Sequence, residues 1–242
     1  SEIVQIETAN AEATHRGDLG HRINAPRVFE IYRHLGLHAT CPVHEEVWGS
    51  TFLKGWILRR NDDRDVWARL PSAILKAGKS AEDPLTLLSP VMRSRFMGFD
   101  LKHSASVLFV HSMALQLGAM PHVDPLITAF IRPILADIRT KSSDSPDLIS
   151  LLSAVTKTTR QRFYKIVDTS ALEEEDIHAI LDRFSSSMDP SDINFSHWCG
   201  LMCERYGVSE SDVLSCLSIV SVPGFKFMVH PLFERMAAVD YG

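Results

Sequence analysis

Four residues that can bind a transition metal lie within one short segment of the chain. They are His34, His38, Cys41 and His44. Imidazole nitrogen and thiolate sulfur are preferred zinc ligands, so this set is chemically sufficient for a tetrahedral zinc site. The spacing matches no zinc motif, however, and Gly36 and Pro42 favour a helix end and a turn. Zinc is therefore expected only under the alternative hypothesis of a metal-dependent enzyme, and no other cofactor is predicted.

A second group of metal-binding types, His197, Cys199 and Cys203, lies in a segment with helical spacing. Cys199 and Cys203 stand four residues apart and share one face of a helix, whereas His197 points elsewhere. Buried cysteines behave as small apolar side chains, so these two are expected to pack in the core. The chain also lacks a Gly-x-Ser-x-Gly motif and a His-Glu-x-x-His motif. No catalytic residue is assigned, and a non-enzymatic protein is favoured over an enzyme.

Charge is distributed unevenly along this chain of 242 residues with a net charge of -5. Residues 54–79 and residues 132–165 each hold seven basic and three acidic residues, whereas residues 168–192 hold eight acidic residues and one basic residue. The net negative charge argues against a protein that coats nucleic acid over its whole surface. The acidic segment predicts a surface that meets a basic surface of another copy or another protein.

The two basic segments predict a groove that could bind single-stranded nucleic acid. Arg160, Arg162 and Lys165 alternate with Phe163 and Tyr164, a composition that suits phosphate neutralisation and base stacking. An amphipathic helix with a solvated basic face would have the same composition. The residues predicted to bind nucleic acid are Arg59, Arg60, Arg64, Lys76, Lys79, Arg160, Arg162, Tyr164 and Lys165.

The elements that carry these residues are predicted to be helices, because apolar residues recur at spacings of three and four rather than alternating. The fold class is all-α, with about 9–11 helices and little or no sheet. Helices are expected at 45–58, 101–120, 124–140, 191–206 and 210–220, with a capping box from Ser209 to Asp212. The polar residues of 101–120, among them His111, need hydrogen-bond partners if that helix is buried.

Two lobes are predicted, because residues 141–146 read Lys-Ser-Ser-Asp-Ser-Pro and resemble a linker in composition. The N-terminal helical lobe covers 1–142, with an irregular first 25 residues, and the C-terminal helical lobe covers 143–242. The chain starts with Ser1 rather than Met, which is compatible with a trimmed upstream segment.

Four cysteines are too few for a secreted disulfide framework, and no apolar run approaches the roughly 20 residues that span a bilayer. A cytoplasmic or other reducing compartment is therefore expected, with no membrane partner. The favoured function is an intracellular interaction or self-assembly protein that forms a homo-oligomer or binds another protein. Binding of single-stranded nucleic acid between the lobes would extend this to a nucleoprotein or capsid-like subunit. A partner-binding adaptor without enzymatic activity is the remaining alternative.

Overall fold

The computed structural model describes part of the chain and divides it into two compact units, Ser1–Glu45 and Glu46–Gly242. The described residues are 30, 33–36, 48–52, 54–77, 101–145, 147–163, 172–185, 192–223 and 229–242. In the first unit they form a helical turn that ends at Gly36, whose N–H donates to the Arg33 carbonyl at 3.0 Å. Gly36 has a φ of 73°, which suits the predicted helix end.

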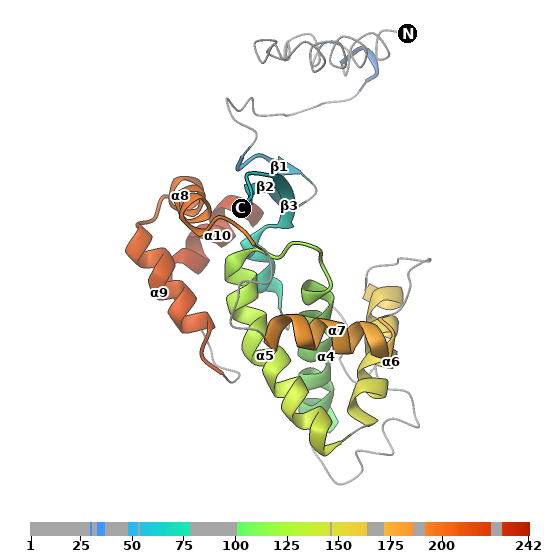
Figure 1. Cartoon of the computed structure of the whole chain (residues 1–242). Coiled ribbons are helices and arrows are strands. Elements are labelled where there is room, and N and C mark those ends of the chain that lie inside the picture. The colour runs from blue at the N-terminus through green and yellow to red at the C-terminus, as the bar shows by residue number, and fades with distance from the viewer. Residues whose placement is uncertain are drawn as a thin grey trace. The chain divides into compact units, whose positions relative to one another are not determined.

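The second unit begins with a small antiparallel sheet followed by helices (Figure 1). The three strands, in the order β1-β2-β3, are Thr51–Phe52, Gly55–Arg59 and Asp65–Arg69. A 3-10 helix, η1, covers Pro71–Lys76, and seven α-helices follow in the described residues. They are α4 (Leu101–Gly118), α5 (Pro125–Asp144), α6 (Asp147–Phe163), α7 (Glu174–Ser185), α8 (Phe195–Tyr206), α9 (Glu210–Val220) and α10 (Pro231–Tyr241). The predicted all-α-dominant class with little sheet is confirmed.

The helix predicted at 45–58 is wrong, because this region holds β1 and β2. Trp56 and Leu58 are fully buried, as expected for alternate residues of a strand, and they pair with Ala68 and Val66 of β3. A short apolar run fits strand and helix periods alike, and here the partner strand decided between them. Lys54 adopts a φ of 63° in the turn between β1 and β2.

Gly55 is required where β2 leaves this turn, because the indole ring of Trp67 lies against it. A β-carbon at Gly55 would stand 2.1 Å from a ring atom of Trp67. We expect Gly55→Ala to lower the free energy of unfolding by about 1–3 kcal/mol, the usual cost of overpacking, in urea denaturation followed by circular dichroism. Gly200→Ala in α8 is the matched control, since nothing lies within 4 Å of its β-carbon. Equal stability of the two variants would contradict the packing argument.

The other helix predictions agree with the structure apart from small shifts of their ends. The helix predicted at 101–120 is α4, and the helix at 124–140 is α5, which continues to Asp144. The pair at 191–206 and 210–220 corresponds to α8 and α9. Gly207 ends α8 with a φ of 61°, and Ser209 and Asp212 form the predicted capping box.

One hydrophobic core connects β2, β3, η1 and the helices of the second unit. It contains Trp56 and Leu126 from before residue 142 and Leu152 and Trp198 from after it. The segment predicted as a linker is mostly helical, because α5 extends to Asp144 and α6 begins at Asp147. The boundary after residue 142 stays a prediction. Within the described residues, no helix has the length and apolarity that a membrane crossing requires.

Candidate functional site

Four consecutive acidic residues lie around the start of α7. Ile177, Ile180, Leu181 and Phe184 recur at helical spacing and are buried, so the opposite face is exposed. Glu173, which precedes the helix, and Glu174, Glu175 and Asp176 of its first turn are all exposed. Acidic residues at a helix N-terminus favour the helix through its macrodipole. These four residues are called the acidic face of α7 below.

The acidic face of α7 presents its carboxylates to solvent. None of the four residues forms an ion pair with a basic residue in the described part of the chain. Farther along the same helix, Asp182 does pair with Arg139 of α5, at 3.3 Å. The unneutralised charge is therefore concentrated at the start of α7, where it could attract a cationic surface.

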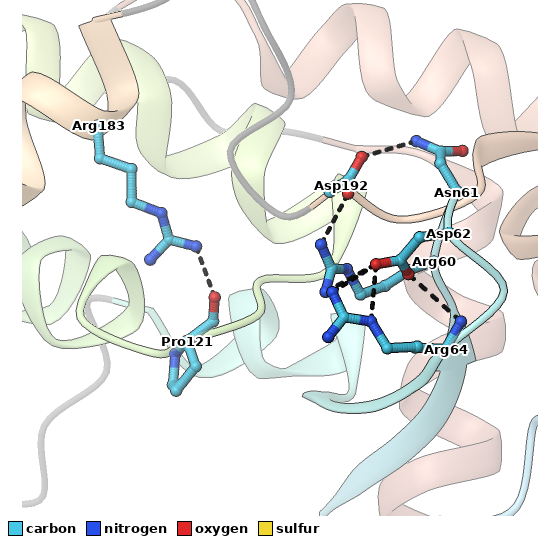
Figure 2. A network of polar contacts seen from close by, with 7 residues as sticks. All are labelled: Arg60, Asn61, Asp62, Arg64, Pro121, Arg183 and Asp192. Carbon is cyan, nitrogen blue, oxygen red and sulfur yellow. Dashed lines mark hydrogen bonds and ion pairs between the residues drawn. The ribbon is translucent and has the colours of Figure 1, made fainter.

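The basic hairpin between β2 and β3 is largely neutralised by carboxylates (Figure 2). Arg60 pairs with Asp192 at 2.8 Å, and the Arg64 Nε donates to Asp62 at 2.7 Å. Arg59 pairs with Asp63 at 2.7 Å. The hydrogen bond from Arg64 holds the pKa of Asp62 below its usual value. The charges of three arginines that were predicted to bind nucleic acid are thus paired with carboxylates of the same protein.

Asp192 connects this hairpin to the segment that precedes α8. Its carboxylate accepts hydrogen bonds from Asn61 at 3.0 Å and from Arg60, and these bonds lower its pKa (Figure 2). Its carbonyl accepts from the Asn61 N–H at 3.1 Å, and the Asn194 N–H donates to the Arg59 carbonyl at 2.8 Å. Part of the acidic segment therefore serves as an internal counterion for the basic segment.

Arg183, the one basic residue of the acidic segment, has a structural contact as well. Its guanidinium donates to the carbonyl of Met120 at 2.8 Å, just beyond the end of α4. It also donates to the carbonyl of Pro121 at 2.7 Å (Figure 2). Carbonyls that follow a helix C-terminus need such donors, because no further helical turn supplies them. This contact secures α7 against the end of α4.

The remaining residues predicted to bind nucleic acid are only partly described. Arg160 and Arg162 belong to α6, but their side chains lie outside the described residues, as do Lys79, Tyr164 and Lys165. Lys76 ends η1, and its ammonium lies 4.0 Å from the centroid of the Tyr241 ring. Nucleic-acid binding by these residues stays a prediction.

Of the predicted metal ligands, the structure describes only His34, which is exposed. His38, Cys41 and His44 lie outside the described residues. Among the residues that are described, no three His, Cys, Asp or Glu side chains are arranged to hold a metal ion. Zinc binding at 34–44 therefore stays a prediction.

The second cluster packs as expected. Cys199 is buried in the core, and burial, with a smaller contribution from Cys203, raises the pKa of its thiol to about 11. A thiol with such a pKa is protonated at neutral pH and is a poor nucleophile or metal ligand. His197 lies edge-on to Trp48, with ring centroids 5.3 Å apart.

A basic surface that was not predicted as a unit lies where α10 packs on η1. The ammonium of Lys54, like that of Lys76, lies near the ring of Tyr241, at 5.6 Å from its centroid. The Tyr241 hydroxyl donates to the Ser72 carbonyl at 3.1 Å, which holds the ring in place. Arg69 is exposed and stands opposite Gly55, the residue after Lys54. This surface is called the lysine–tyrosine patch below and consists of Lys54, Arg69, Lys76 and Tyr241. It could not be predicted from the sequence, because Tyr241 lies far from the other three residues along the chain.

A buried carboxylate, Asp124, was also missed, although its place before Pro125 is a recognisable N-cap signal. Its Oδ1 accepts from the Leu126 N–H at 2.8 Å, and its Oδ2 accepts from the Trp198 indole at 2.7 Å. Complete burial raises its pKa to about 7, although these bonds oppose the shift. The buried Trp56 indole N–H has no hydrogen-bond partner of standard geometry among the described residues. Asp124 connects α5 to α8 and has no access to a substrate from solvent.

One ring nitrogen of the buried His111 of α4 has a partner, whereas its Nδ1 has none among the described residues. Its Nε2 lies 3.2 Å from Asp137 of α5, whose carboxylate also pairs with Lys141. Burial lowers the pKa of His111 despite the attraction of Asp137. The imidazole is therefore neutral at pH 7, and the contact joins two core helices.

Comparison with known proteins adds no assignment to these surfaces. No protein-family model matches this chain, and neither a curated protein nor a solved structure was found to match it. Two of the arrangements described above are exposed to solvent and opposite in charge. They are the acidic face of α7 and the lysine–tyrosine patch.

Proposed function

We propose that this protein is a non-catalytic interaction and self-assembly protein, and that the acidic face of α7 is a contact surface for a basic surface of another chain. The single observation that carries this proposal is the exposure of four carboxylates that no described basic residue neutralises. Complementary charge accelerates and orients protein association. Because no described basic residue pairs with these carboxylates, their charge is available to a second molecule.

The buried polar groups also support a non-catalytic role. Asp124, Asp240 and His111 each bond to other protein groups and connect core elements. The two buried thiols, Cys199 and Cys216, have pKa values raised by burial to about 11 and about 12. A nucleophile or a general base needs contact with a substrate, and these buried groups contact other protein groups instead. Their contacts support a structural role.

Nucleic-acid binding is the weaker part of the proposal. Phosphates would have to compete with Asp62, Asp63 and Asp192 for the hairpin arginines. Exposed ion pairs contribute only about 0–1 kcal/mol, so this competition is feasible but lowers the affinity. We propose protein association as the primary function and binding of single-stranded nucleic acid as a secondary one.

Reversal of charge on α7 tests the primary function. We expect wild type to self-associate in sedimentation velocity at about 0.05 M salt and to dissociate at about 0.5 M, because the Debye length falls about threefold. Glu174→Lys with Glu175→Lys should remain monomeric at both salt concentrations, since two lysines beside Glu173 and Asp176 leave the face with no net charge to attract a basic partner.

The control must match both the charge and the helix position of these substitutions. Glu204→Lys with Glu210→Lys changes the net charge equally at exposed positions, and Glu210 lies in the first turn of α9. The control should associate as wild type does. Association that survives the α7 reversal, or a wild type that is monomeric at low salt, would show that the proposal is wrong.

A further inference from the structure

Three cations of the lysine–tyrosine patch face solvent without a counterion. Lys54, Arg69 and Lys76 are exposed, and none forms an ion pair with an acidic residue that the structure describes. The arginines of the hairpin differ in this respect, because Arg59, Arg60 and Arg64 each have a carboxylate within reach. The patch is therefore a basic surface whose charge is not neutralised by any described carboxylate.

The protein holds these like charges close together. The two ammonium groups lie 4.0 and 5.6 Å from one ring centroid, so their separation cannot exceed the sum of these distances. That limit is close to the Debye length of about 10 Å at 0.1 M salt, and the ammonium groups therefore repel each other. A bound anion would relieve this repulsion. Cation–π attraction to Tyr241 offsets part of it, at about 0.5–1 kcal/mol for each exposed contact.

Backbone contacts hold together the segments that carry the cations. The Lys54 carbonyl accepts from the Leu70 N–H at 3.0 Å, which ties the turn between β1 and β2 to the start of η1. The contacts of α10 with η1 and the hydrogen bond from Tyr241 to Ser72 complete the arrangement. The patch is thus preorganised on three separate segments of the chain, which lowers the entropic cost of binding an anionic partner.

The acidic face of α7 is opposite in charge to this patch. Its four carboxylates occupy about one helical turn, which spans about 5 Å along the axis. α7 packs on α4, α5 and α6, whereas the patch belongs to β3, η1, α10 and the turn after β1. No ion pair joins the two surfaces within the described part of one chain, so both remain available to a second copy.

We infer that the lysine–tyrosine patch of one copy binds the acidic face of α7 of the next copy. This inference rests on the proposed function and names its partner. Because the two surfaces differ, the contact either repeats head-to-tail in a ring or an open filament, or is made twice, reciprocally, in a two-fold dimer. The contact is electrostatic, so its strength falls with salt.

Complementary charge reversal tests the contact directly. Lys54→Glu with Lys76→Glu makes the patch acidic, and Glu174→Lys with Glu175→Lys cancels the net charge of the α7 face, where Glu173 and Asp176 remain. We expect each variant alone to be monomeric in sedimentation velocity at about 0.05 M salt. An equimolar mixture should associate, because the intact patch of the α7 variant meets the intact α7 face of the patch variant.

Two further variants separate the contact from effects on folding and on net charge. Lys54→Gln with Lys76→Gln removes the charge without adding repulsion, and it should weaken association at least tenfold if circular dichroism shows a folded protein. Lys141→Glu with Lys157→Glu reverses two exposed lysines of α5 and α6 and should associate as wild type does.

The outcomes distinguish this inference from the proposed function. Association that is lost on reversal of α7 but kept on neutralisation of Lys54 and Lys76 would overturn the inference alone, because α7 would then dock on another surface. A folded, monomeric mixture of the two reversed variants would also overturn it. A monomeric wild type would refute the proposed function and the inference together.

Discussion

Asp124→Asn should weaken the pH dependence of stability between about pH 5 and about pH 8. The pKa of Asp124 is about 7 in the folded protein, above the ordinary value of 3.8. A raised pKa stabilises the folded state at low pH, and this contribution is lost as pH rises towards the folded pKa. From pH 5 to pH 8, wild type should therefore lose about 3 kcal/mol more than the variant, at about 1.4 kcal/mol per pH unit below the pKa.

The hydrogen bonds of Asp124 predict a second property of this variant. Both carboxylate oxygens accept bonds, Oδ1 from the Leu126 and Ile127 N–H groups and Oδ2 from the Trp198 indole. An asparagine has only one accepting oxygen, so its amide nitrogen would meet a buried N–H group. We expect the variant to be less stable than wild type by about 1–3 kcal/mol at pH 5, and, because wild type then loses about 3 kcal/mol more, equally stable or up to about 2 kcal/mol more stable at pH 8.

Asp212→Asn provides the control for the Asp124 experiment. Asp212 also bonds at a helix N-terminus, but hydrogen bonds to Ser209 lower its pKa. A lowered pKa contributes stability that is lost only as pH falls below the ordinary value, so Asp212 stays ionised from pH 5 to pH 8. Urea denaturation across this range should give wild-type pH dependence for Asp212→Asn. The same dependence for Asp124→Asn would refute a titrating buried carboxylate.

Asp240→Ala should destabilise the protein by about 3–5 kcal/mol, because it removes one partner of a nearly buried ion pair. The side chain of Asp240 is 1% exposed and bonds both to the guanidinium of Arg205 and to the Tyr206 hydroxyl, which lies at 2.9 Å. These bonds attach α10 to α8. Without the carboxylate, the Arg205 charge would remain partly buried and unpaired, at 23% exposure.

A double substitution tests the origin of this effect. Arg205→Leu with Asp240→Leu removes both charges, and it should recover most of the lost stability, since paired buried charges are often replaceable by apolar side chains. Tyr206→Phe should cost only about 1 kcal/mol, the usual contribution of one hydrogen bond. The measurement is urea denaturation at neutral pH. A double variant as unstable as Asp240→Ala would indicate that shape rather than charge holds α10.

The same experiment bears on the lysine–tyrosine patch. Asp240 precedes Tyr241, so loss of the Asp240 contacts would free the end of α10 from η1. In Asp240→Ala we therefore expect weaker self-association as well as lower stability, whereas the double leucine variant should regain both. Recovery of stability without recovery of association would point to a direct electrostatic role of Asp240 in the contact.

Several features followed directly from local sequence signals. Helical spacing identified α4, α5, α8 and α9, and the Ser209–Asp212 capping box depends only on neighbouring residues. The region of β2 was predicted as a helix, because the apolar residues around Trp56 and Leu58 fit a helix as well as a strand. Pairing with β3, which lies outside this local pattern, makes it a strand. Local patterns are informative where the stabilising contacts are local, and a sheet is formed by contacts that are not.

The charge pattern shows the same limit at the candidate site. The sequence by itself determined a mostly helical protein with one acidic segment and two basic ones. Only the tertiary structure decided which charges are neutralised. Arg60 pairs with Asp192 across 132 residues, whereas Lys54 and Lys76 both lie near the ring of Tyr241. The physical reason is that charge is a property of each residue, whereas neutralisation depends on distances that the folded core sets.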